Sequence, residues 1–116
     1  MSDLTNKTVV ITGASRGIGA AAARHLASLG ASVVLAARST GDIERIAKEI
    51  EAAGGTATAM ACDVARNEDV KALVARTVEL YGGLDVLVNN AGLIDPIARL
   101  ADSDPDAWSQ VVDVNV

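Results

Sequence analysis

The sequence predicts one α/β domain with a doubly wound parallel sheet of about four strands, in the order 3-2-1-4, and with helices on both faces. The main observation is that short aliphatic runs alternate with segments whose apolar residues recur at helical spacing. Such alternation is typical of parallel strands joined by right-handed helical crossovers. Size is the second observation, because 116 residues, 50% of them hydrophobic, suffice for a single core.

The first strand and helix follow from residue type and spacing. Residues 8–12 are a continuous β-branched run, which is typical of a strand buried on both faces. A helix is expected over 17–29, and Gly30 then provides its C-terminal cap. Its apolar residues at helical spacing are Ile18, Ala22, Leu26 and Leu29.

A second strand and helix repeat this arrangement. Residues 32–36 predict another buried strand. Thr40 or Asp42 can cap a helix that continues through Ala53, where two glycines close it. The expected inner face of this helix consists of Ile43, Ile46, Ala47 and Ile50.

The third strand and helix are followed by a fourth strand. Residues 56–62 predict a weaker strand, and Asn67 is a candidate N-cap for a helix that ends near Leu80. Its expected inner residues are Val70, Leu73, Val74 and Val78. Residues 84–88 then predict a fourth, buried strand.

The last segment is expected to be a helix. After a loop that contains Pro96, Asp104 can cap and Pro105 can begin a helix that continues to Val116. The apolar edge of the fourth strand, at 86–88, would then have no neighbour. We expect the isolated chain to be marginally stable or to self-associate through that edge.

A glycine-rich turn follows the first strand. Gly13, Gly17 and Gly19 are spaced G-x-x-x-G-x-G and lead directly into a helix. Glycine accepts positive φ and allows a ligand to approach the backbone closely. The first N–H groups of a helix have no intrahelical partner, and together with the helix dipole they attract anions. We predict a nucleotide phosphate over Gly17-Ile18-Gly19, with a simple tight turn as the alternative.

Composition excludes several classes of function. The formal net charge of −5 provides no basic surface for nucleic acid, so we expect no nucleic-acid partner. No apolar run reaches the length of a membrane span, and residues 1–7 lack the pattern of a signal peptide. Cys62 is the single cysteine, so no internal disulfide is possible, and a buried, inert thiol in a reducing cytoplasm is expected. We predict no metal site.

Several polar segments follow strand ends. The glycine turn, Arg38, Asp63 and residues 89–92 each come after a predicted strand. In a doubly wound sheet the ligand lies beyond the carboxyl ends of the strands. We therefore expect these segments to meet on one rim.

These segments, in this order and spacing, resemble a classical short-chain dehydrogenase/reductase with a Rossmann-type fold. The resemblance rests on Thr12-Gly13-Ala14-Ser15-Arg16-Gly17-Ile18-Gly19, Asp63-Val64, Asn89-Asn90-Ala91-Gly92 and Asn115, and it covers nearly the whole chain. It implies that the glycine turn binds a pyrophosphate, that Asp63 and Val64 border an adenine, and that 89–92 lie beside the cofactor riboses. Asn115 would match the family's catalytic asparagine, which holds a water of a proton relay.

Other interpretations of these residues remain open. Asp63 is also an ordinary turn residue and cap, and a strand-end turn alone would favour Asn and Gly at 89–92. For Asn90 the alternative is a residue that braces the sheet rather than one that contacts a ligand. For Asn115, one residue from the chain end, the alternative is that it frays and holds nothing.

The end of the second strand favours NADP(H) over NAD(H). A carboxylate usually holds the ribose 2′-OH at this position, but Leu35-Ala36-Ala37-Arg38-Ser39 contains none. The Arg38 guanidinium suits a phosphate dianion, and Arg16 can approach from the glycine turn. Ser15 and Ser39 add hydroxyl donors. The alternative is that both arginines are solvated surface charges.

The residues for catalysis are incomplete. The family uses a serine and a tyrosine with a lysine four residues later, but Tyr81 is the only tyrosine and no lysine follows it at that spacing. We interpret Tyr81 as a packing residue and 1–116 as the N-terminal, dinucleotide-binding portion of a larger single-domain protein. The resemblance implies hydride transfer between a nicotinamide and a carbonyl or alcohol in a parent that forms homo-oligomers. The chain alone would be a cofactor-binding fragment without turnover.

Overall fold

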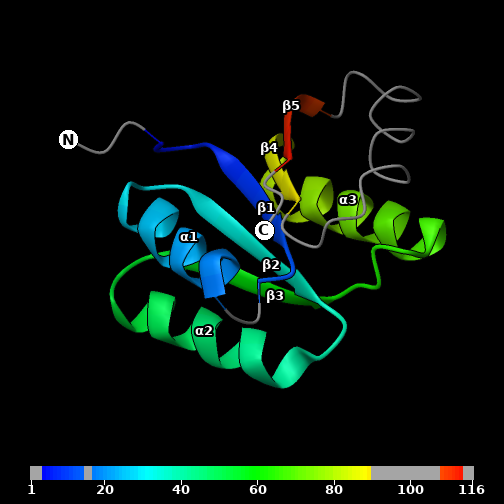
Figure 1. Cartoon of the computed structure of the whole chain (residues 1–116). Helices are drawn as coiled ribbons and strands as arrows, with labels where there is room; N and C mark the ends of the chain where they lie inside the picture. The colour runs from blue at the N-terminus through cyan, green and yellow to red at the C-terminus, as the bar shows by residue number, and fades with distance from the viewer. Residues whose placement is uncertain (1–3, 15–16, 90–107, 114–116) are drawn as a thin grey trace.

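A computed structural model describes residues 4–14, 17–89 and 108–113, and for Asn89 and 108–113 it describes the backbone only. Strands and helices alternate along the chain as far as β4, as the sequence predicts (Figure 1). The elements are β1 (Thr8–Thr12), α1 (Gly17–Ser28), β2 (Ser32–Ala37), α2 (Thr40–Ala52), β3 (Thr56–Ala61), α3 (Asn67–Tyr81), β4 (Leu84–Asn89) and β5 (Trp108–Asp113).

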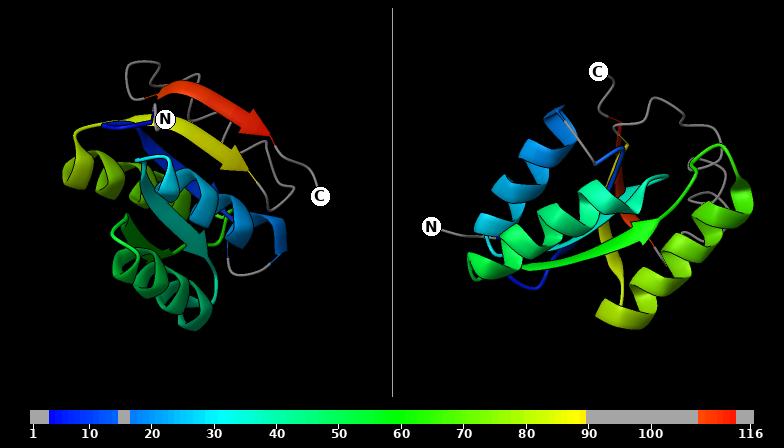
Figure 2. Two further views of the ribbon diagram at one scale, coloured as in Figure 1. Left: turned by 90° about the vertical axis from the view of Figure 1, so that its left-hand side faces the viewer. Right: turned by 90° about the horizontal axis from the view of Figure 1, so that it is seen from below.

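The strands form one sheet in the order β3-β2-β1-β4-β5, and every neighbouring pair is parallel. Helices α1 and α2 cover one face of the sheet and α3 covers the other (Figure 2). This confirms the predicted doubly wound α/β class and the order 3-2-1-4 of the first four strands. The strand order reverses at β1, because its neighbours β2 and β4 continue the chain on opposite sides.

The core lies in two layers, because successive strand residues point to opposite faces of the sheet. On the face of α1 and α2, Ile11 and Leu35 pack with Ile43 and Ile46 of α2. On the other face, side chains of the strands pack with two residues of α3, in the cluster Val10, Val34, Leu87, Val70 and Leu73. The inner face predicted for α2 is confirmed, since all four of its residues are buried.

Helix α1 turns a different face to the sheet than its larger apolar residues suggest. Its buried residues are small, namely Gly19, Ala20, Ala23 and Ala27. Ala22 and Leu26 are only partly buried, and Ile18 is 53% exposed. Small side chains let the helix axis approach the β-branched sheet surface closely, so the helix is oriented by its alanines rather than by Ile18.

The N-caps of α2 and α3 lie earlier in the chain than predicted. The sequence suggested Thr40 or Asp42 for α2 and Asn67 for α3. The N-cap residues are Ser39 and Arg66, and neither side chain makes a capping hydrogen bond. Asp42 instead lies in the first turn of α2, where its charge complements the helix dipole. Gly82 ends α3 with a φ of 82°, a left-handed conformation that glycine adopts without strain.

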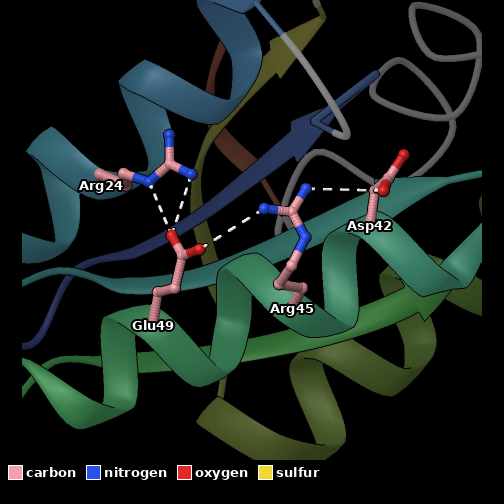
Figure 3. A network of polar contacts seen from close by, with 4 residues as sticks. All are labelled: Arg24, Asp42, Arg45 and Glu49. Atoms are coloured by element: carbon pink, nitrogen blue, oxygen red, sulfur yellow. Dashed lines mark hydrogen bonds and ion pairs between the residues drawn. The ribbon is translucent and has the colours of Figure 1, made fainter.

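A network of exposed ion pairs joins α1 to α2 (Figure 3). Arg24 Nη2 lies 2.9 Å from Glu49 Oε2, and Arg45 contacts both Glu49 Oε1 and Asp42 Oδ1 at 3.5 Å. Because these side chains are about half exposed, each pair contributes less than about 1 kcal/mol. The network therefore contributes little to the stability of the fold. Among the described residues no helix has the length and apolarity of a membrane span.

The predicted C-terminal helix is wrong where the structure describes it, because Trp108–Asp113 is the strand β5. This strand pairs in parallel with β4, from Leu84 opposite Trp108 to Asn89 opposite Asp113. The expected open edge of β4 is therefore also wrong, since β4 has a neighbour on each side. The physical reason is that β4 carries a row of N–H and C=O groups that pairing with a strand satisfies and packing of a helix does not.

Candidate functional site

The carboxyl ends of four strands align at one edge of the sheet. Thr12 at the end of β1 lies opposite Ala36 of β2 and Asn89 of β4. Ala37 and Ala61, which end β2 and β3, lie opposite each other. The described segments that follow these strands therefore form a rim, which we call the carboxyl rim: 13–14, 17–19, 38–39, 62–66 and Asn89.

Backbone hydrogen bonds hold the start of each rim segment to its neighbour. Ala14 N donates to Ala36 O at 3.3 Å, which fixes the glycine turn against the end of β2. Cys62 N donates to Ala37 O at 2.9 Å and extends the β2–β3 pairing beyond the strands. The Thr12 hydroxyl donates to Val88 O at 3.4 Å and joins β1 to β4.

The glycine turn has the backbone conformation that its sequence predicts. Gly13 and Gly17 have φ values of 62° and 61°, a region that other residues enter only with strain. A Cβ built at Gly17 would meet nothing within 4 Å, so the space beside this glycine is open. Helix α1 begins at Gly17, and its first-turn N–H groups at 17–19 have no intrahelical acceptor. Ser15 and Arg16 lie outside the described residues.

The end of β2 presents a cation to solvent. Arg38 and Ser39 are both exposed. No hydrogen bond or ion pair within the described part of the chain engages the Arg38 guanidinium, and the Ser39 hydroxyl makes no cap bond to α2. The nearest acidic residue along the chain, Asp42, contacts Arg45. This end of the rim can therefore accept an anion.

The end of β3 forms a closed turn around Asp63. Asp63 Oδ1 accepts a hydrogen bond from Ala65 N at 3.0 Å, and Asp63 O accepts one from Arg66 N at 2.9 Å. Asp63 N in turn donates to Asp69 Oδ2 of α3 at 3.0 Å. The Val64 side chain is only 8% exposed and belongs to the core beside α3. Of the two predicted residues, Asp63 thus holds the turn through one carboxylate oxygen, and the Val64 side chain is buried in the core cluster.

The other predicted site residues are less fully described. Asn89 ends β4, and its backbone pairs with Thr12 and Asp113. Asn90, Ala91, Gly92 and Asn115 lie outside the described residues. Ile18 is 53% exposed in the first turn of α1 and places an apolar side chain beside the glycine turn.

Cys62 and Tyr81 are placed as the sequence analysis expects. Cys62 is 3% exposed, and burial raises the pKa of its thiol from 9.0 to about 11, with Asp69 and Asp63 adding to the shift. The thiol is therefore protonated and unreactive near neutral pH. The Tyr81 hydroxyl lies 2.5 Å from Thr58 Oγ1, and the ring packs against the core cluster beside α3.

Asp69 contacts the carboxyl rim, and the sequence analysis did not single it out. It lies in the first turn of α3, and its carboxylate accepts the Asp63 amide six residues earlier in the chain. The only signal in the sequence is an acidic residue near a helix N-terminus, which the helix dipole alone explains.

Comparison with known proteins identifies the family. The short chain dehydrogenase model matches residues 7–116. An uncharacterized oxidoreductase of Listeria innocua is 42% identical over 97% of this chain and 45% of its own length. The 2,5-dichloro-2,5-cyclohexadiene-1,4-diol dehydrogenase of Sphingobium indicum is 42% identical over 100% of this chain and 45% of its own length.

A solved structure is also similar. A metagenomic short-chain oxidoreductase in complex with NADP is 49% identical, with a TM-score of 0.74 over 78% of this chain and 41% of that one. The chain thus spans less than half the length of each of these relatives. On the family match, the relatives and the shared fold, the chain belongs to the short-chain dehydrogenase family of oxidoreductases.

Proposed function

We propose that this chain is the cofactor-binding part of an NADP(H)-dependent oxidoreductase. The observation that carries the proposal is the alignment of strand ends, which brings the N-terminus of α1, Arg38 and Asp63 to the carboxyl rim. Each group supplies what one part of the dinucleotide requires. The bound cofactor would supply or accept the hydride, and this chain would bind and orient it.

The residues fit a dinucleotide. The N–H groups of 17–19 and the dipole of α1 suit the pyrophosphate, and the open space beside Gly17 leaves room for it. The exposed Ile18 side chain offers an apolar contact next to this position. Asp63 is an acceptor suited to the amino group of adenine, and residues 89–92 would lie beside the riboses.

The preference for NADP(H) rests on Arg38. A guanidinium that is exposed and without an ion pair among the described residues can form paired hydrogen bonds with a 2′-phosphate. Ser39 adds a hydroxyl, and we assign Ser15 and Arg16 to the same phosphate from the glycine turn. The NADP complex of a relative 49% identical to this chain supports the assignment.

For the whole protein we propose hydride transfer between the nicotinamide and a carbonyl or alcohol carbon, with Asn115 in the proton relay. We place it in the cytoplasm, where a reduced NADPH pool favours carbonyl reduction, and expect homo-oligomers. This chain alone contains no tyrosine followed by lysine at the family spacing, so we expect no turnover from it.

A titration tests the proposal. NADPH and NADH are added separately to the purified chain, and binding is followed by nicotinamide fluorescence and calorimetry. We expect NADPH to bind at least about tenfold more tightly than NADH, which corresponds to about 1.4 kcal/mol. Equal affinities would remove the NADP(H) assignment, and the absence of binding by both would contradict the cofactor-binding function.

A further inference from the structure

We propose that Asp69 is a positioning residue for the adenine end of the cofactor site. It acts through Asp63, and the inference rests on the proposed function. The observation is the hydrogen bond from Asp63 N to Asp69 Oδ2, at 3.0 Å, which ties the turn after β3 to the first turn of α3.

The turn uses one carboxylate oxygen of Asp63 and leaves the other available. Asp63 Oδ1 accepts a hydrogen bond from Ala65 N at 3.0 Å. No hydrogen bond in the described part of the chain engages Oδ2. The backbone of Asp63 is held on both sides, because its N–H donates to Asp69 and its C=O accepts from Arg66. The direction of the available oxygen is therefore fixed by the backbone that Asp69 holds.

The chemistry of adenine makes this direction matter. In a dinucleotide the adenine ring carries a single hydrogen-bond donor group, its 6-amino group, and a carboxylate is acceptor-only when ionised. A fixed carboxylate gains more from this contact than a mobile one, because less conformational entropy is lost on binding. Asp69 thus contributes to recognition of the base without touching it.

Alternative roles for Asp69 predict different results. A residue that only complements the dipole of α3 would act through its charge, and Glu68 in the same turn would then be equivalent. Glu68 is exposed and makes no hydrogen bond or ion pair among the described residues, so Glu68→Ala is the matched control. Asp69→Asn removes the charge but keeps an oxygen that can accept the Asp63 amide.

The experiment measures binding of two ligands to four forms of the chain. The forms are the unaltered chain, Asp69→Ala, Asp69→Asn and Glu68→Ala. The ligands are NADPH and its hypoxanthine analogue, in which a carbonyl replaces the 6-amino group. We expect Asp69→Ala to lower the affinity for NADPH about five- to tenfold and the affinity for the analogue less than twofold. Asp69→Asn and Glu68→Ala should stay within about twofold for both ligands. Hydrogen exchange of the Asp63 amide should be faster in Asp69→Ala only.

Each other outcome contradicts a specific statement. Equal losses for NADPH and the analogue would make Asp69 merely structural. A loss in Asp69→Asn or Glu68→Ala as large as in Asp69→Ala would indicate a charge effect, and both results overturn the positioning role. If Asp69→Ala does not fold, Asp69→Glu replaces it, because it keeps the charge but moves the acceptor oxygens by one methylene group. The same selective loss of NADPH binding and faster exchange of the Asp63 amide are then expected, and unchanged NADPH binding would overturn the positioning role. If the unaltered chain binds neither ligand, the proposed function fails and this inference fails with it. If it binds NADPH normally but Asp69→Ala is unchanged, the inference alone fails.

Discussion

The ends of β2 and β3 lie side by side on the carboxyl rim, but they are built in opposite ways. After β2, Arg38 and Ser39 are exposed, the Arg38 guanidinium has no ion pair among the described residues, and the Ser39 hydroxyl makes no cap hydrogen bond. After β3, Asp63 is held by hydrogen bonds through its N–H, its C=O and one carboxylate oxygen.

This difference separates two means of recognition. An exposed guanidinium attracts an anion by charge and forms paired hydrogen bonds with it, so it discriminates between ligands by the presence of a phosphate. A carboxylate that is held in place selects a ligand by the direction of the hydrogen bond that it accepts. We therefore expect substitutions after β2 to alter ligand affinity with little effect on stability, and substitutions after β3 to alter both.

The largest effect is expected from Arg38→Asp. Reversing the charge replaces an attraction for the 2′-phosphate with a repulsion. We expect the affinity for NADPH to fall by about 30- to 100-fold, or about 2–3 kcal/mol, and the affinity for NADH to fall by less than about threefold. Parallel fluorescence titrations measure both, and thermal unfolding should change little because Arg38 is exposed. Equal weakening of the two cofactors would contradict the assignment of Arg38 to the phosphate.

The pH dependence of stability tests the closed end of β3. The pKa of the Cys62 thiol is raised from 9.0 to about 11 in the fold, so above pH 9 the unfolded chain loses its proton first. Stability should therefore decline as pH rises, by about 2 kcal/mol between about pH 8 and pH 11.

Urea unfolding of the unaltered chain and of Cys62→Ala, measured across this range, isolates the effect. Every other group is the same in both proteins, so only the difference between their free energies of unfolding reports Cys62. We expect the unaltered chain to lose its advantage as the pH rises. A constant difference would mean that Cys62 is not shielded from solvent as the structure shows it.

The contrast between the two strand ends also explains what the sequence could predict. The strands, the parallel order and the rim follow from local patterns, because a β-branched run such as 8–12 and a glycine turn have few alternative structures. The availability of Arg38 was also predictable, since the absence of a carboxylate after β2 is visible in the sequence.

Two features depend on three-dimensional geometry that no local sequence pattern encodes, and they were not predictable in this way. The hydrogen bond between Asp63 and Asp69 depends on how the turn after β3 is oriented against the start of α3. Pro105 predicts the start of a helix that would include residues 108–113, but these residues instead pair with the edge of β4 as a strand. In α1 the exposed Ile18 shows the same limit, because packing distance rather than hydrophobicity decides which face is buried.

A smaller effect is expected from Asp63→Ala. The substitution removes the acceptor of the Ala65 amide, which lies at an exposed position. Loss of one such hydrogen bond should lower the free energy of unfolding by about 1 kcal/mol. Asp63→Asn keeps an oxygen for this bond and should cost less than half as much. Urea denaturation of both variants measures the difference, and an Asp63→Ala variant as stable as the unaltered chain would show that the turn is not held by its side chain.

The smallest effect is expected from Ser39→Ala, and its size distinguishes the two strand ends most directly. Serine at a helix N-cap normally contributes about 1 kcal/mol because its hydroxyl accepts a first-turn N–H. Ser39 is the N-cap of α2 but makes no such bond, so we expect Ser39→Ala to change the free energy of unfolding by less than about 0.3 kcal/mol. The same substitution should lower the affinity for NADPH about two- to threefold, because the Ser39 hydroxyl is available to bind the 2′-phosphate. A full cap cost in urea denaturation, with unchanged NADPH affinity, would mean that this hydroxyl serves the helix, and the end of β2 would then be as closed as that of β3.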